Sequence, residues 1–319
     1  MLVLGFLGTV IGMERAVATG RGWAWITPFG AAAAVVAMLA GRPGAAAVSL
    51  LAAGAVLVAV FVAAYRDQPE PHLVLMTAGA SAWVLAAFTW TLGASVPSLV
   101  PWLSTFLVLT IAGERLELAR TIGTSDVARR WLWGSAAIVV AGSAVAWVSL
   151  QAGARLAGAG NLLVAVWLLG NDLARRTIRL GGVTRYMAAG LLAGYLWLGI
   201  AGALWMVSGL MPGTTAYDAA LHSLFLGFVM SMIMAHAPVV IPALGGVSFP
   251  WSPALWVPLG LLHGSVLVRV AGGLATSGAI QRWGAALNAV ALAVFAATAI
   301  VIVATGRRRR RARTGHRAT

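Results

Sequence analysis

The segment that decides the fold is Ala219–Leu244, AALHSLFLGFVMSMIMAHAPVVIPAL, which is long and apolar enough to cross a bilayer. It carries a histidine near each end, His222 and His236. In a regular α-helix, side chains fourteen positions apart point within roughly 40° of each other and lie roughly 21 Å apart along the axis. We therefore expect the two imidazoles to share a face of this helix without sharing a site.

Ionisable side chains inside a membrane are costly, so each histidine is a candidate for proton relay, an ion pathway or cofactor ligation. A hydrogen bond from an imidazole to a carbonyl of a neighbouring helix is the structural alternative. The chain has no cysteine, which excludes thiolate metal sites and cysteine nucleophiles. It also lacks the phosphate-binding loop, the dinucleotide-binding glycine motif, the zinc-protease motif and the nucleophile elbow.

The rest of the chain has the same apolar character. Of its 319 residues, 61% are hydrophobic and 9% are charged, and its mean hydropathy is +0.91, a composition that excludes a soluble globular domain. Apolar runs of about 20 residues predict an all-α, polytopic transmembrane helix bundle of about 11 spans. The runs are 1–13, 23–40, 44–65, 72–92, 97–113, 131–150, 154–171, 186–209, 217–240, 252–271 and 283–305.

Arginine supplies all 22 cationic residues, and its distribution predicts the orientation of the chain through the positive-inside rule. Eighteen arginines fall in alternate connections and the C-terminal tail: Arg15, Arg21, Arg66, Arg115, Arg120, Arg129, Arg130, Arg175, Arg176, Arg179, Arg185, Arg307 to Arg311, Arg313 and Arg317. Only Arg42, Arg155, Arg269 and Arg282 fall on the other side. We therefore expect a bacterial cytoplasmic (inner) membrane protein with an external N terminus and a cytoplasmic C terminus. The net charge of +14 then reflects orientation and contact with anionic lipid headgroups, not binding to nucleic acid.

The chain is organised as one predicted transmembrane domain, residues 1–305, followed by an arginine-rich cytoplasmic tail, residues 306–319. The motifs at 11–15 (IGMER) and 111–115 (IAGER) end the first and fifth runs, and 234–236 (MAH) ends the ninth. This spacing predicts three four-helix repeat units, the last one helix short. The glutamate–arginine pairs serve most simply as interfacial ion pairs that end helices, and proton transfer is the alternative. The first run is too short to cross a bilayer, so we expect an upstream extension that completes it, in a bundle of up to 12 spans.

A cofactor site is predicted on the outer half of the ninth and tenth spans. The tenth span places His263 near the middle of the membrane and Arg269 about 9 Å further out, and the predicted topology puts His222 in the outer half as well. Two neutral imidazoles are good axial ligands for haem iron, and an arginine suits a haem propionate. We therefore expect His222, His263 and Arg269 to bind haem b. The two imidazoles differ in depth by roughly 10 Å if both helices stand straight, and a helix tilt would reduce this difference.

A copper site is the corresponding prediction for the cytoplasmic side. His236 follows Met230 and Met234, which lie four positions apart, and thioether and imidazole groups together suit Cu(I). Packing is the alternative role for these methionines. His72, at the start of the fourth run, is expected to be an interfacial residue and is the other candidate partner for His236. Asp218 is expected to cap the ninth helix, with a role in a proton path as the alternative.

The strings LGFLGTVIGMERAVA and LHSLFLGFVMSMIMAHAPVVIPAL resemble the NnrS-like family of bacterial polytopic proteins. Members of that family are associated with haem, copper and nitric oxide stress, and they are distantly similar to the catalytic subunit of haem-copper oxidases. The resemblance implies that His222 and His236 match the histidine-bearing helix of the family, and that the bundle follows a twelve-helix, three-unit plan. The chain departs from an oxidase in having neither a paired His-His nor a closely spaced His-x-His.

The leading hypothesis is therefore a haem-binding, and copper-binding, membrane protein with a respiratory-accessory or nitric-oxide-stress role. The alternative is a secondary transporter or channel in which the intramembrane histidines and Arg269 bind a small anion or move protons. Catalytic turnover, substrate and oligomeric state have no signature in the sequence. The visible absorption spectrum of the purified protein separates the two hypotheses, because a Soret band supports the first.

Overall fold

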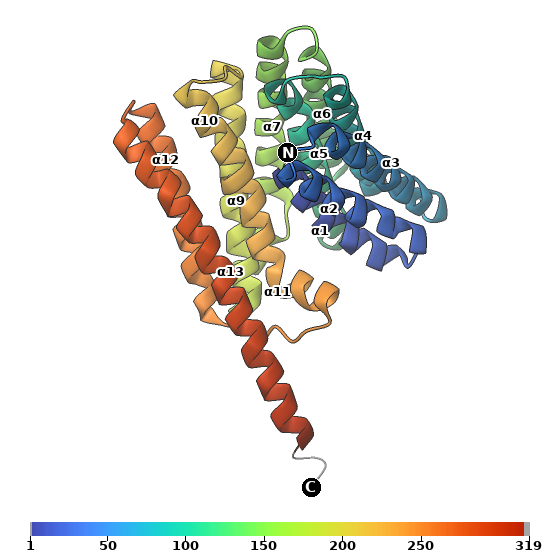
Figure 1. Cartoon of the computed structure of the whole chain (residues 1–319), viewed down its shortest axis with the longest axis vertical. Coiled ribbons are helices and arrows are strands. Elements are labelled where there is room, and N and C mark those ends of the chain that lie inside the picture. The colour runs from blue at the N-terminus through green and yellow to red at the C-terminus, as the bar shows by residue number, and fades with distance from the viewer. Residues whose placement is uncertain (1, 316–319) are drawn as a thin grey trace. The chain divides into compact units, whose positions relative to one another are not determined.

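The computed structural model describes residues 2–315, and every regular element in that range is a helix (Figure 1). Met1 and residues 316–319, among them His316 and Arg317, lie outside the described residues. The long helices are α1 (Leu2–Thr19), α2 (Ile26–Leu39), α3 (Pro43–Asp67), α4 (Pro71–Thr91), α5 (Val96–Ala119), α6 (Asp126–Val145), α7 (Leu150–Asn171), α9 (Gly182–Ser208), α12 (Trp256–Leu274) and α13 (Gly278–Gly315). The shorter elements are η1 (Gly22–Trp25), η2 (Arg120–Ile122), α8 (Ala174–Thr177), α10 (Thr215–His222), η3 (Ser223–Met230), α11 (Ser231–Gly245) and η4 (Pro253–Leu255).

Nine segments of the described chain are long and apolar enough to cross a membrane, and one of them, Thr215–Gly245, joins α10, η3 and α11. The prediction of an all-α, polytopic helical bundle is confirmed, and the chain is a multi-pass membrane protein. Helices α1 and α6 coincide with two further predicted runs but are not among the nine. Helix α6 carries Asp126, Arg129 and Arg130, which lower its hydropathy.

Several predicted boundaries differ from the observed ones. Helix α1 continues to Thr19, so Glu14 and Arg15 lie within it, and α5 likewise continues past Glu114 to Ala119. The sequence predicted that the two pairs end their helices, and this prediction was wrong. The sixth run was placed at 131–150, whereas α6 ends at Val145 and residues 146–149 turn the chain into α7. Helix α13 runs without a break past the expected boundary at 305/306.

Helix starts and stops follow from local chemistry. Proline opens α3 and α4 at Pro43 and Pro71, where the missing N–H group costs nothing because the first turn has no acceptor for it. Ser125 caps α6 by accepting a hydrogen bond from the backbone N–H of Ala128 at 3.1 Å. Helix α11 ends at Gly245 and is capped by Gly246, whose φ of 58° is in the left-handed region that favours glycine.

The helices form two compact units, which we describe separately. Unit 1 comprises the residues up to Leu168 together with Trp205–Leu210, and unit 2 comprises Leu169–Leu204 and the residues from Met211 onward. Each unit consists mainly of membrane helices. The division does not fall at the limits of four-helix repeats, and the three-unit plan stays a prediction.

Close packing at small residues builds unit 1. The buried Trp83 of α4 stacks against Phe106 of α5 with ring centroids 5.0 Å apart, and it lies so close to Gly8 of α1 that a Cβ atom there would come within 2.3 Å. Helices α6 and α7 approach so closely that a Cβ on Gly142 would lie 2.2 Å from the amide nitrogen of Ala157. In lipid, such close approach supplies the dispersion energy that holds helices together.

The two repeated motifs meet in unit 1. Arg15 of α1 forms an ion pair with its neighbour Glu14 at 2.6 Å and lies 3.5 Å from Glu114 of α5. Each motif lies one turn before the end of its helix, since α1 ends at Thr19 and α5 at Ala119. The pairing supports the structural interpretation of these charges as ion pairs, although they join two helices instead of ending them.

In unit 2, the segment that the sequence treated as one regular helix changes its winding. Residues Ser223–Met230 form a π-helical segment, η3, between α10 and α11. A π-helix bonds each N–H to the carbonyl five residues back, so it holds more residues per turn than an α-helix. The expectation that His222 and His236 share a face assumed a regular α-helix between them. That assumption was wrong for the eight residues of η3.

Candidate functional site

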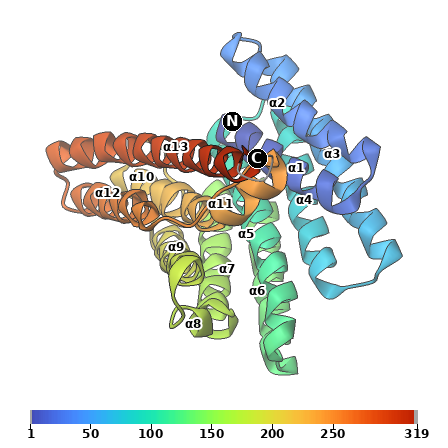
Figure 2. The ribbon, with the colours of Figure 1, turned by 90° about the horizontal axis from the view of Figure 1, so that it is seen from below.

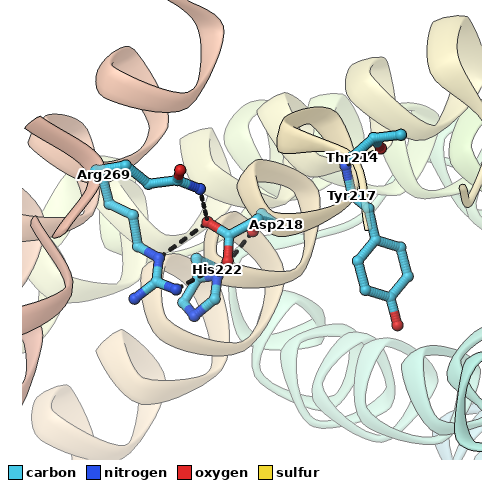
Figure 3. A network of polar contacts seen from close by, with 6 residues as sticks. Thr214, Tyr217, Asp218, His222 and Arg269 are labelled. Atoms are coloured by element: carbon cyan, nitrogen blue, oxygen red, sulfur yellow. Dashed lines mark hydrogen bonds and ion pairs between the residues drawn. The ribbon is translucent and has the colours of Figure 1, made fainter. Parts of the chain in front are cut away.

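Three helices of unit 2 meet around the carboxylate of Asp218 (Figure 3). Arg269 of α12 donates two hydrogen bonds to it, from Nε to Oδ2 at 2.9 Å and from Nη2 to Oδ1 at 2.8 Å. Gln281 of α13 donates a third from Nε2 to Oδ2 at 2.9 Å. The side chains of Asp218 and Arg269 are 24% and 18% exposed. A fork-like guanidinium contact of this kind is among the stronger charge-assisted arrangements in proteins.

His222 lies on the same helix as Asp218, one turn further on, and its ring lies beside the carboxylate (Figure 3). Its Nδ1 is 2.7 Å from the backbone carbonyl oxygen of Asp218 and 3.3 Å from Oδ1. A carbonyl oxygen can only accept, so the Nδ1 atom of His222 carries the hydrogen. The Nε2 atom then holds a lone pair, and it has no hydrogen-bond partner among the described residues.

The start of α10 explains where these side chains point. Thr214 caps the helix by accepting a hydrogen bond from the N–H of Tyr217 at 3.2 Å, and the ring of Tyr217 points away from the cluster (Figure 3). Asp218 lies just inside the helix, where the dipole favours a negative charge. The prediction that Asp218 caps the helix was wrong, because the Thr214 hydroxyl fills that role and frees the carboxylate for Arg269.

His263 belongs to a different hydrogen-bonded chain. Its Nδ1 accepts a hydrogen bond from Nε1 of Trp197 at 3.0 Å, because an indole nitrogen can only donate. The hydrogen of the ring therefore lies on Nε2, which donates to the Ser231 hydroxyl at 3.3 Å. Ser231 donates in turn to the carbonyl of Gly190 at 2.7 Å. This chain links α9, α11 and α12 and fixes His263 as a neutral imidazole.

The structure brings together only two of the three residues predicted to bind haem b. His222 and Arg269 meet at Asp218, and His263 does not join them. As an axial ligand, His222 fits, because Nδ1–H is held by a carbonyl and Nε2 holds the free lone pair. His263 does not fit as it stands, since both ring nitrogens are engaged. Arg269 is likewise committed to a carboxylate instead of being available to a propionate.

The predicted copper ligands lie at the end of η3 and in α11. His236 has its Nδ1 2.7 Å from the carbonyl of Met232, one turn back, as His222 does with Asp218. Met234 is buried, and its carbonyl accepts a hydrogen bond from Tyr186 at 3.0 Å, whereas Met230 is half-buried. Within the described chain, no three His, Asp or Glu side chains are grouped closely enough to hold a metal ion. A copper site using methionine stays a prediction.

His72 is buried within unit 1 at the start of α4, and its position at the membrane interface stays a prediction. It is 7% exposed, and its Nε2 lies 3.6 Å from Oε2 of Glu117 in unit 1. His236 belongs to unit 2, so the two histidines lie in different units.

Three residues that were not predicted from the sequence contact the predicted ones: Gln281 bonds to Asp218, and Trp197 and Ser231 bond to His263. Gln281 was detectable as an uncharged polar side chain next to an apolar run. Trp197 and Ser231 carry no such signal, because tryptophan and serine are common in membrane helices for other reasons.

Comparisons with known proteins add the family. The model of DUF8744, described as a domain of unknown function, matches residues 1–304. Because this match covers nearly the whole chain, the chain belongs to that family. No curated protein and no solved structure matches the chain.

Proposed function

We propose that this member of the DUF8744 family is a secondary transporter or channel that moves protons through unit 2. The observation that carries the proposal is the cluster of Asp218, Arg269 and His222 within helices that are apolar enough to cross a membrane. Two titratable groups, the carboxylate and the imidazole, lie 3.3 Å apart there. Intramembrane groups of this kind mark proton and ion pathways.

The contacts of Arg269 favour protons over a small anion. The guanidinium is engaged twice by the Asp218 carboxylate, so the pair has no net charge with which to attract a second anion. An anion would first have to displace that carboxylate. A proton needs only the lone pair on Nε2 of His222. Once protonated, the imidazolium would keep its Nδ1–H on the Asp218 carbonyl and be stabilised by the carboxylate beside it.

The interrupted helix supplies a means of movement. Segment Thr215–Gly245 contains the π-helical η3 and two internal prolines, Pro238 and Pro242. π-helical turns and prolines weaken the regular hydrogen-bond ladder, and transporters use such broken helices at their binding sites. Rearrangement of this helix would carry His222 between two environments.

The proposal includes an orientation. The arginine distribution supports a bacterial cytoplasmic membrane protein with a cytoplasmic C terminus, which puts the Asp218 end of unit 2 on the outer side. The arginine-rich tail, residues 306–319, would then contact anionic lipid headgroups.

The test is proton flux into vesicles containing the purified protein, driven by a potassium diffusion potential and read with an internal pH dye. We expect flux above that of empty vesicles, and a reduction of about tenfold or more for Asp218→Asn, which removes the titratable group. The matched control is Asp126→Asn, which removes an exposed carboxylate paired with Arg129 in unit 1 and should leave the flux unchanged. Flux equal to that of empty vesicles, or equal in Asp218→Asn and the parent, would refute the proposal.

Haem binding is the second candidate, and the geometry of His222 favours it. An imidazole held through Nδ1–H by a carbonyl, with Nε2 open, is the usual form of a metal-ligating histidine. Bound haem would supply ligand binding or electron transfer, in keeping with the respiratory-accessory or nitric-oxide-stress role that the NnrS-like resemblance implies. The copper prediction at His236, Met230 and Met234 belongs to this candidate.

The absorption spectrum tests the second candidate. If His222 is the ligand and His263 is not, His222→Ala should abolish a Soret band, whereas His263→Ala should retain it. Retention of the band in His222→Ala would exclude His222 as the ligand. A protein purified after haem supplementation that shows no Soret band would leave proton movement as the surviving proposal.

A further inference from the structure

Helices α12 and α13 pack in a register that sets Asn288 of α13 opposite Ser265 of α12. The two helices lie side by side in both views (Figures 1 and 2). A Cβ on Gly272 would lie 2.6 Å from the amide nitrogen of Gln281, and one on Gly284 would lie 2.5 Å from that of Arg269. Positions further along α13 thus contact positions earlier in α12, so the two helices are antiparallel. One turn past Gly284, the same register sets Asn288 opposite Ser265.

The register of α10 and α12 leads to the same level. Gly273 packs against Thr215, with a Cβ position 3.5 Å from the Thr215 carbonyl oxygen, and Arg269 bonds to Asp218. These helices are also antiparallel, so one turn further on, His222, which lies within about 40° of Asp218 around the helix, faces the turn of α12 that contains Ser265. The level below the Asp218 carboxylate therefore brings together polar residues from three helices. We call it the second polar layer, and it consists of His222, Ser265 and Asn288.

The second polar layer has hydrogen-bonding groups that the protein does not satisfy. Asn288 is 4% exposed, and neither its Oδ1 nor its Nδ2 has a partner. The Nε2 atom of His222 likewise has no hydrogen-bond partner among the described residues. Ser265 donates to the carbonyl of Leu262 at 2.9 Å. Polar groups buried without partners in a membrane are costly, so donors and acceptors gathered at one level point to an occupant that can both donate and accept.

We propose that the second polar layer is a hydrated site, in which water reaches the buried side chains of Ser265 and Asn288 from the Asp218 end of unit 2. Water is the smallest molecule with both donors and acceptors, and a water-filled site typically has two to four polar partners. The inference deepens the proposed function, on which its role rests, by giving protons a path between the outer surface and His222.

The experiment uses the absence of cysteine from the chain, which makes any introduced cysteine the sole reactive thiol. Asn288→Cys and Ser265→Cys are exposed in intact spheroplasts to a membrane-impermeant, cationic methanethiosulfonate, and the modified fraction is measured against time. The reagent reacts with the thiolate, which forms in water and not in hydrocarbon. The controls are Leu287→Cys and Val290→Cys, which flank Asn288 on α13 at positions 37% and 48% exposed on the apolar helix surface.

We expect Asn288→Cys and Ser265→Cys to react about tenfold or more faster than either control. Equal rates would overturn the inference. If Asn288→Cys fails to elute as folded protein on size exclusion, Ser265→Cys decides the result alone, since serine and cysteine differ in a single atom. Reactive cysteines in a protein without proton flux would sink the transport proposal and keep the hydrated site. Proton flux with unreactive cysteines would do the reverse.

Discussion

At the scale of single residues, Asp218 is held by one cation and one amide. Arg269 and Gln281 come from different helices, so the carboxylate joins α10, α12 and α13. The pair is about four-fifths buried, and removing one partner of such a pair leaves an uncompensated charge in a medium of low dielectric constant. The cluster therefore contributes to the stability of unit 2 as well as to its proposed chemistry.

Replacing Arg269 by glutamine should lower the stability of unit 2 by about 2–4 kcal/mol, because the Asp218 carboxylate then lacks its charged partner. The loss is measurable as a fall in the thermal midpoint of the protein in detergent. The double variant Asp218→Asn/Arg269→Gln should recover part of it, because neither charge remains. If the stability losses of Asp218→Asn and Arg269→Gln simply added up in the double variant, the two residues would be energetically independent.

Unlike the Asp218 cluster, the hydrogen bonds of His263 are all between neutral groups. Trp197→Phe removes the indole donor and leaves the Nδ1 lone pair of His263 buried. We expect a loss of about 1–3 kcal/mol in the same thermal assay. An unchanged midpoint would mean that the His263 ring does not depend on this bond.

At the scale of the helices, glycine decides which pairs come into close contact. Helix α6 carries two glycines with opposite surroundings: Gly142 faces the backbone of α7, whereas a Cβ on Gly134 would meet no atom within 4 Å. The same substitution at these two positions therefore separates packing from helix propensity.

Gly142→Ala should destabilise unit 1 by about 1–3 kcal/mol, because the new methyl group would lie 2.2 Å from the Ala157 amide nitrogen, a backbone atom that cannot rotate away. Gly134→Ala should be neutral or slightly stabilising, since alanine is the better helix former. The thermal midpoints of both variants test this. A similar loss in both would show that glycine matters here for backbone freedom and not for contact.

At the scale of the whole molecule, the proposed orientation of the chain in the membrane decides from which side protons and reagents reach Asp218. Reporter fusions after Arg130, Arg185 and Arg313 should report the cytoplasm, and fusions near Ser95, Gly153 and Gly213 should report the outside. These positions lie near the ends of membrane helices, so each fusion samples a different connection. A periplasmic signal at Arg185 would invert the access route to Asp218 and the side from which the thiol reagent must be added.

The sequence by itself determined that this is a polytopic helical protein. A backbone inside lipid must satisfy its own hydrogen bonds, so apolar runs of this length have to be helices. The sequence also indicated His222, Arg269 and His263 as candidate functional residues, because charged and titratable groups are rare in such runs.

Only the tertiary structure decided how these residues pair. Arg269 meets Asp218 across 51 positions of sequence, Gln281 meets Asp218 across 63, and Trp197 meets His263 across 66. Which faces meet depends on how each helix is rotated about its axis, and close packing at small residues sets that rotation. Hydropathy along the sequence does not specify which neighbouring helix each face meets. The π-helical winding of η3 shifts the faces of α10 and α11 relative to one another, which reasoning from a regular helix does not foresee.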